Sequence, residues 1–124
     1  MSRLQVLCQV CWQPIERGHL GIDTQKVSAF QAAEAARGKV ETADDLLETL
    51  MAGPEVPQWM THCGRCEPNT CGYCIEVSQL RTYKDLVRWT AHLMGKTWFA
   101  VTDWDHMLGD IARGRDRRFR EVVS

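Results

Sequence analysis

Three pairs of cysteines with identical spacing constrain this chain more than any other feature of its sequence. The pairs are Cys8 and Cys11, Cys63 and Cys66, and Cys71 and Cys74. Two cysteines separated by two residues can share one tight turn and aim both sulfurs at a common point, as a tetrahedral metal ion requires. The spacing therefore indicates metal binding, or else the redox chemistry of a thioredoxin-type pair.

Metal binding is the interpretation that the surrounding sequence favours. A thioredoxin-type pair opens a helix after a strand, whereas the first pair here is followed by residues 12–14 (Trp-Gln-Pro) and a strand-like run. Residues 1–4 lack the apolar core of an export signal. We therefore expect a cytoplasmic protein, in which disulfides are rare. Buried reduced thiols remain the alternative, although chance rarely spaces three pairs alike.

The turns Cys8–Cys11 and Cys63–Cys66 are predicted to hold one structural zinc ion between them, with Gly64 relieving crowding in the second turn. Four thiolates would complete the zinc shell and leave no position for water or substrate. Three further side chains remain alternative ligands: His62, Cys71 and Cys74. A second zinc would need more ligands, for which only His19 and His62 are plausible, so we expect one zinc ion for each chain.

The composition is that of one globular domain of 124 residues. Hydrophobic residues make up 44% and charged residues 25%, and no apolar run is long enough to span a membrane. Fifteen Lys and Arg against sixteen Asp and Glu leave a formal charge of −1, which argues against a globally basic nucleic-acid binder. Within 113–124, however, five arginines against two acids give a local charge of +3.

Hydrophobic periodicity and capping residues predict an α+β fold. We expect a small antiparallel sheet around a pair of zinc knuckles, of the zinc-ribbon or treble-clef type, with about four helices. Strands are expected at 3–7, 12–15, within 19–27 and at 74–80, with a short strand or extended turn at 96–101. Helices are expected at 29–37, 43–52, 83–94 and after Thr102, the first three capped by Ser28, Thr42 and Thr82 and the last by Thr102 itself. Residues 1–124 form one zinc-stabilised domain in this interpretation, with a helical insertion at 28–55 and a basic C-terminal tail at 113–124.

Four segments together resemble small zinc-binding proteins of unknown function from actinobacteria and their phages. They are "CQVCWQPI", "CGRCEP", "IEVSQLRTYKDLVRWTAHLMGKTW" and "TDW". The resemblance covers most of the chain outside 28–55 and is most specific in "LRTYKDLVRWTAHLMGKTW". It implies metal ligation and a cytoplasmic setting and carries no activity with it. In such proteins the position of Cys74 is aromatic or apolar, which implies that the third pair lies outside the metal site.

The function that we expect is that of a non-enzymatic zinc module acting as a regulatory or interaction protein. An example would be a phage-encoded regulator that docks on a protein in the host cytoplasm. Tryptophan and arginine dominate protein interfaces, and this chain has five tryptophans. Trp12 and Trp59 adjoin the metal turns and are expected to shield them, while Trp89 lies on the inner stripe of its helix. Trp98 and Trp104 remain as candidate partner contacts.

The alternative is a zinc protein that binds nucleic acid through its arginine-rich C-terminal tail. Guanidinium groups contact phosphates and release counterions, and Trp98 and Trp104 could stack on bases. The candidate arginines are Arg113, Arg115, Arg117, Arg118 and Arg120.

A nuclease of the His-Asn-His type is the third hypothesis, suggested by Asp105 and His106. The catalytic histidine of such enzymes lies between two knuckles beside a hairpin, whereas His106 follows both knuckles. The motifs of zinc deaminases and of His-Glu-x-x-His proteases are absent from the sequence. We therefore expect no catalytic residue, no small-molecule substrate and no membrane partner, and an unidentified protein or nucleic acid as the partner.

Overall fold

A computed structural model of the chain describes residues 2–37, 42–43, 56–67 and 72–123. Its strands are β1 (Ser2–Val6), β2 (Gly18–Ile22), β3 (Met60–Cys63), β4 (Tyr73–Glu76) and β5 (Phe119–Val123). Its α-helices are α1 (Thr24–Arg37), α3 (Tyr83–Leu93) and α4 (Trp104–Ala112), with short 3-10 helices at Val77–Gln79 and Phe99–Val101. The strands form two antiparallel sheets, which confirms the α+β class.

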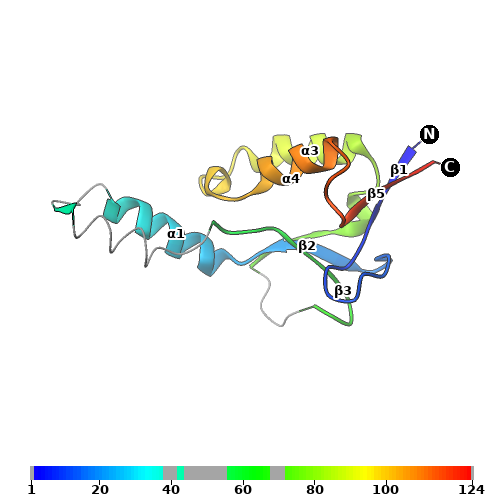
Figure 1. Ribbon diagram of the computed structural model, residues 1–124, viewed down its shortest axis with the longest axis horizontal. Coiled ribbons are helices and arrows are strands. Elements are labelled where there is room, and N and C mark those ends of the chain that lie inside the picture. The colour runs from blue at the N-terminus through cyan, green and yellow to red at the C-terminus, as the bar shows by residue number, and fades with distance from the viewer. Residues whose placement is uncertain (1, 38–41, 44–55, 68–71, 124) are drawn as a thin grey trace.

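The larger sheet has the strand order β3-β2-β4, so β2 is its central strand. Leu20 of β2 lies opposite Thr61 of β3 and Ile75 of β4, and all three are buried. His19, one residue earlier, is half-buried because successive side chains of a strand point to opposite faces. One face of the sheet therefore belongs to the core beneath α3 and α4, and the other face points outward (Figure 1).

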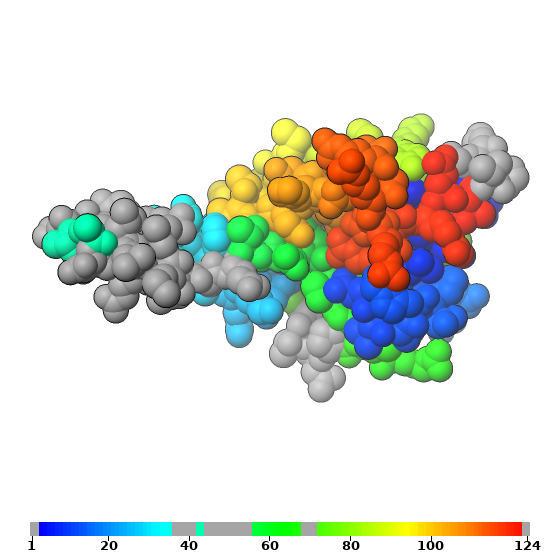
Figure 2. Space-filling view, in the orientation of Figure 1, coloured from blue at the N-terminus to red at the C-terminus, as the bar shows by residue number. Residues whose placement is uncertain are grey.

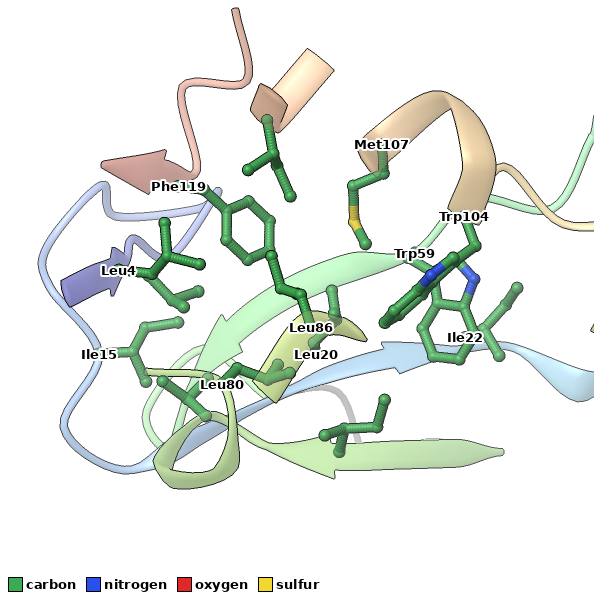
Figure 3. Packing of buried hydrophobic residues seen from close by; sticks show 14 of the residues in the cluster. Leu4, Ile15, Leu20, Ile22, Trp59, Leu80, Leu86, Trp104, Met107 and Phe119 are labelled. Carbon is green, nitrogen blue, oxygen red and sulfur yellow. The ribbon is translucent and has the colours of Figure 1, made fainter. Parts of the chain in front are cut away.

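The core combines side chains from both sheets and from helices α3 and α4 (Figure 3). Trp59 and Trp104 pack edge to face within it, with ring centroids 5.0 Å apart. Each indole N–H donates to a threonine hydroxyl, Trp59 to Thr102 at 3.2 Å and Trp104 to Thr90 at 2.9 Å. Both large aromatics are therefore buried without leaving a polar group unpaired.

The smaller sheet joins the two ends of the chain, because β1 pairs with β5 from Ser2 opposite Val123 to Val6 opposite Phe119. The segment expected to be a basic tail thus contains a strand, and the termini lie side by side (Figure 1). The partner expected for β1, at 12–15, makes only an isolated bridge between Leu7 and Pro14. Proline has no N–H to continue a ladder, which explains why this pairing stops there.

Helix α3 confirms its sequence prediction, including the capping box between Thr82 and Asp85, whose two hydrogen bonds measure 3.1 and 3.2 Å. Helix α1 begins at Thr24, five residues before the predicted start, so the predicted cap Ser28 lies inside the helix. The carboxylate of Asp23 accepts hydrogen bonds from two backbone N–H groups of the first turn, at 2.9 and 3.3 Å. Asp23 therefore performs the capping role assigned to Ser28.

The predicted cap of α4 is wrong, because the helix begins at Trp104 and its N-cap residue is Asp103. The Thr102 hydroxyl donates to the carbonyl of Phe99 at 2.8 Å and accepts from Trp59, so it does not cap the helix. The strand or extended turn expected at 96–101 is also wrong, since this segment forms turns and a 3-10 helix.

About four helices were expected, and the described residues contain three α-helices. The helix expected at 43–52 lies outside the described residues apart from Ala43. None of the described helices combines the length and the apolar character needed to cross a membrane.

Arg118, just before β5, ties together segments that are distant in the sequence. Its guanidinium donates to both carboxylate oxygens of Asp116 at 2.9 and 3.0 Å, to the carbonyl of Trp59, and to Oε1 of Gln9 at 3.2 Å. Arg118 and Asp116 are largely buried, with 16% and 7% of their side-chain surface exposed. The pair is therefore a structural connection rather than a surface charge.

Arg118→Ala should lower the free energy of unfolding by about 2–3 kcal/mol, because it leaves a buried carboxylate and a carbonyl without their donor. Urea denaturation followed by circular dichroism measures this loss. Arg113→Ala removes an exposed arginine and should change stability by less than about 0.5 kcal/mol. Equal losses in the two variants would contradict a bridging role for Arg118.

Candidate metal centre

The two turns predicted to bind a metal meet at one point. The Sγ atoms of Cys8, Cys11, Cys63 and Cys66 all lie within 4.8 Å of one another. The separation of Cys11 and Cys63 is 3.8 Å, and all four cysteines are free thiols. A tetrahedral ion with metal–sulfur bonds of about 2.3 Å needs sulfurs about 3.8 Å apart, so these four could hold a metal ion. Across the described part of the chain, they are the only group of three or more potential ligands gathered so closely.

The first turn follows β1 and is closed by backbone hydrogen bonds. The N–H of Trp12 donates to the carbonyl of Cys8 at 2.7 Å, and the N–H of Cys8 donates to the carbonyl of Gln13 at 3.0 Å. Trp12 has φ of 58°, a left-handed conformation that is rare for a bulky side chain. The hydrogen bond from Trp12 to Cys8 closes the turn that contains both cysteines, and their sulfurs lie within 4.8 Å of each other.

The second turn begins at the end of β3, where the N–H of Cys66 donates to the carbonyl of Cys63 at 3.0 Å. The glycine expected to relieve crowding here was Gly64, yet a Cβ on it would lie at an ordinary 3.6 Å from the carbonyl oxygen of Arg17. Gly18 is the crowded position instead. A Cβ on Gly18 would lie 2.2 Å from the carbonyl oxygen of His62, so β2 and β3 approach closely only because residue 18 lacks a side chain.

The two turns are held together by residues that the sequence analysis did not identify. Gln9, inside the first turn, donates its N–H to the carbonyl of Thr61 at 3.2 Å and accepts from the N–H of Thr61 through its side chain at 2.9 Å. The buried hydroxyl of Thr61 donates to the carbonyl of Leu7 at 2.8 Å. Because Thr61 lies two residues before Cys63, this Gln9–Thr61 clamp positions one cysteine turn against the other. The sequence shows only that a glutamine follows Cys8, and it does not indicate that this glutamine pairs with a residue 52 positions away.

The electrostatics of the four thiols favour a cation among them. Burial raises the pKa of Cys8, but backbone N–H groups directed at its sulfur outweigh burial and lower the pKa to about 6. The N–H of Cys66 likewise lowers the pKa of Cys63. Contact with the sulfur of Cys63, together with burial, raises the pKa of Cys66 to about 12. The cluster thus favours the thiolate form of Cys8 and Cys63 and disfavours that of Cys66. A bound cation would offset the repulsion between the negatively charged sulfurs.

Of the three alternative ligands, His62 and Cys74 do not join this cluster. His62 precedes Cys63 on β3 and is not among the clustered donors. Cys74 takes part in a disulfide, so it is not a free thiol, and Cys71 lies outside the described residues.

The predicted partner contacts receive mixed support. Trp104 is only 1% exposed, so its indole is not available to a partner, contrary to the prediction. Trp98 is half-buried and packs against Trp59 and Tyr73, with ring centroids 6.2 and 5.3 Å away. The guanidinium of Arg118 already donates to Asp116 and to the carbonyl of Trp59, so it is not available to a partner as predicted. The exposed arginines of the predicted set are Arg113, Arg115, Arg117 and Arg120.

The side chain of Trp12, which is expected to shield the metal turn, is 41% exposed. Trp59 is fully buried. Asp105 and His106, the residues that suggested a nuclease, are both exposed on α4.

Comparison of this chain with protein-family models, with curated proteins and with solved structures finds no match. Its function is therefore argued from the geometry of the metal centre and of the surface around it.

Gly18→Ala should lower the free energy of unfolding by more than about 2 kcal/mol, because the added methyl group would overlap the backbone of β3 next to Cys63. Gly64→Ala, inside the cysteine turn itself, should be close to neutral. Urea unfolding of both variants checks the difference. The opposite order would mean that crowding lies in the turn, as the sequence alone predicted.

Proposed function

We propose that this protein is a zinc-stabilised, non-enzymatic module that docks on another protein through the tip of its first cysteine turn. Four thiolates from two C-x-x-C turns are the ligand set typical of structural zinc. Such a shell has no open position, so the ion has no water or substrate to activate. The ion therefore fixes the turns in place, and the function belongs to the surface that the turns present.

The observation that carries this proposal is the exposed, strained Trp12. It lies beside Val10, which is 59% exposed, at the tip of the first turn. The left-handed backbone of residue 12 favours glycine and costs another residue about 1–2 kcal/mol. Neither burial nor backbone geometry accounts for a tryptophan there, and strain of this kind clusters at binding sites.

Arg117 completes the proposed docking surface. Its guanidinium lies over the Trp12 ring, 4.8 Å from the ring centroid. Figure 2 shows the N-terminal part of the chain, which contains the first turn (blue), beside the segment that leads into β5 (orange to red) on one face of the molecule. A tryptophan held in place by a stacked arginine loses little freedom on binding, and these two residue types dominate interface hot spots.

The charges around Trp12 favour a protein over a nucleic acid. A hollow beside Trp12 is lined by Arg115, Arg117 and Arg118, and also by Asp103, Asp110 and Asp116. A phosphate backbone would meet these carboxylates, whereas a protein surface can offer both signs of charge. The resemblance to proteins of actinobacteria and their phages leads us to propose a host protein of an actinobacterium as the partner.

The zinc proposal predicts that protein desalted in the presence of a chelator retains one zinc ion for each chain. Cys8→Ser should lose this zinc and unfold or aggregate, because the ion contributes about 10–16 kcal/mol of apparent binding free energy in small zinc modules. Cys74→Ser, studied in a reducing buffer, should keep the zinc because Cys74 is outside the cluster. Elemental analysis and circular dichroism measure both effects. Zinc-free folded wild-type protein would contradict the proposal.

The docking proposal predicts that Trp12→Gly abolishes capture of a partner and leaves the fold intact. Relief of the left-handed strain offsets the lost stacking of Arg117, so the free energy of unfolding should change by less than about 1 kcal/mol. Loss of a hot-spot tryptophan should weaken binding at least about 30-fold. Capture from a nuclease-treated actinobacterial lysate, followed by titration of the captured protein, measures this loss.

Val87→Ser is the matched control, because Val87 of α3 is 68% exposed and carries no predicted role. It should retain the partner that Trp12→Gly loses. Capture that disappears after nuclease treatment and falls steeply with added salt would favour the nucleic-acid alternative and overturn a protein partner.

A further inference from the structure

We propose that the outward face of the β3-β2-β4 sheet carries a second site for a divalent transition-metal ion, with His19, His62 and Glu67 as ligands. This proposal does not depend on the docking function, and it concerns a face of the sheet that the thiolate centre does not use.

The register of the sheet places the two histidines side by side. His19 of β2 lies directly opposite His62 of β3. The next pair, Leu20 and Thr61, is buried on the core side, so both histidines point to the outward face. Directly opposed residues of antiparallel strands have Cβ atoms about 4.5–5.5 Å apart. Two imidazoles at that separation can reach one ion with metal–nitrogen bonds of about 2.0–2.1 Å.

The third ligand already contacts the first. Glu67, which follows the second cysteine turn, makes a hydrogen bond through Oε1 to Nδ1 of His19. The side chains of His19 and Glu67 are 33% and 29% exposed, so an ion from solvent can reach them. An ion seated between these two atoms would replace the hydrogen bond that now joins them.

Rotation of the half-exposed His62 side chain completes the site. The three donor atoms are not yet gathered within the 4.8 Å that the four sulfurs satisfy, so the ion itself assembles its ligands. Strand alternation places His62 and Cys63 on opposite faces, which separates this site from the thiolate centre. Two imidazoles and a carboxylate suit zinc, cobalt, nickel or copper, and three protein ligands leave a position for water.

Cobalt titration tests the proposal, with Co²⁺ itself as the probe, on protein that carries one zinc ion for each chain after desalting in the presence of a chelator. Zinc in the thiolate centre is spectroscopically silent. Cobalt bound by nitrogen and oxygen gives weak visible bands without the intense sulfur-to-cobalt absorption that displaced thiolate zinc would produce. We expect one further metal ion for each chain, counted by equilibrium dialysis, and no sulfur-to-cobalt band.

His19→Ala and His62→Ala should each lose the second ion and keep the thiolate zinc. Glu67→Gln should weaken cobalt binding by at least about 10-fold, since even indirect partners of metal ligands contribute that much. If His19→Ala does not fold, the other two half-buried positions still decide the question.

His92→Ala and His106→Ala are the matched controls, because both histidines are exposed on helices away from this face. Both controls should bind cobalt as the wild type does. The proposal is overturned if wild-type protein binds no second ion, or if His19→Ala and His62→Ala bind it unchanged. The thiolate zinc is counted separately, so this failure is distinguishable from failure of the zinc centre.

Discussion

The structure depends on the meeting of two cysteine turns, in which the sulfurs of Cys11 and Cys63 lie 3.8 Å apart although the residues are 52 positions apart in the sequence. Closing so long an excursion costs entropy, although that cost grows only slowly with length. The Gln9–Thr61 clamp and the Arg118 guanidinium align the turns, and the thiolates supply the place for an ion. These contacts bring the two turns together, and an ion bound by the four sulfurs would add the free energy that holds them there.

The same connections determine which side chains the first turn presents. Arg118 points inward to Asp116 and the carbonyl of Trp59, while its neighbour Arg117 stacks outside on Trp12. Adjacent arginines therefore have opposite roles, one fixing the base of the turn and the other covering its tip. The contacts of Arg118 hold the base of the turn, and the left-handed backbone at Trp12 is maintained by such surroundings while its indole is exposed.

Sequence reasoning succeeded where the determining interactions are local. The ligand turns follow from C-x-x-C spacing, and α3 follows from its capping box and apolar stripe. It failed where the partner is distant in the chain. The sequence predicts a tail where β5 forms, because the partner of this strand, β1, lies at the other end of the chain. The sequence predicts a partner contact at Trp104, because no local feature indicates that the hydroxyl of Thr90 accepts its indole N–H within the core.

Strand β3 connects these features, because alternation assigns its residues to separate tasks. Thr61 faces the core and receives Gln9, whereas His62 faces outward beside His19. Cys63 ends the strand and joins the thiolate cluster. A one-residue shift in register would bury the histidine and expose the threonine, and it would also withdraw Cys63 from the other sulfurs. Such a shift would bring a residue with a side chain to the position of Gly18, where a Cβ would lie 2.2 Å from the carbonyl oxygen of His62. Gly18 therefore helps to fix the register of β2 against β3.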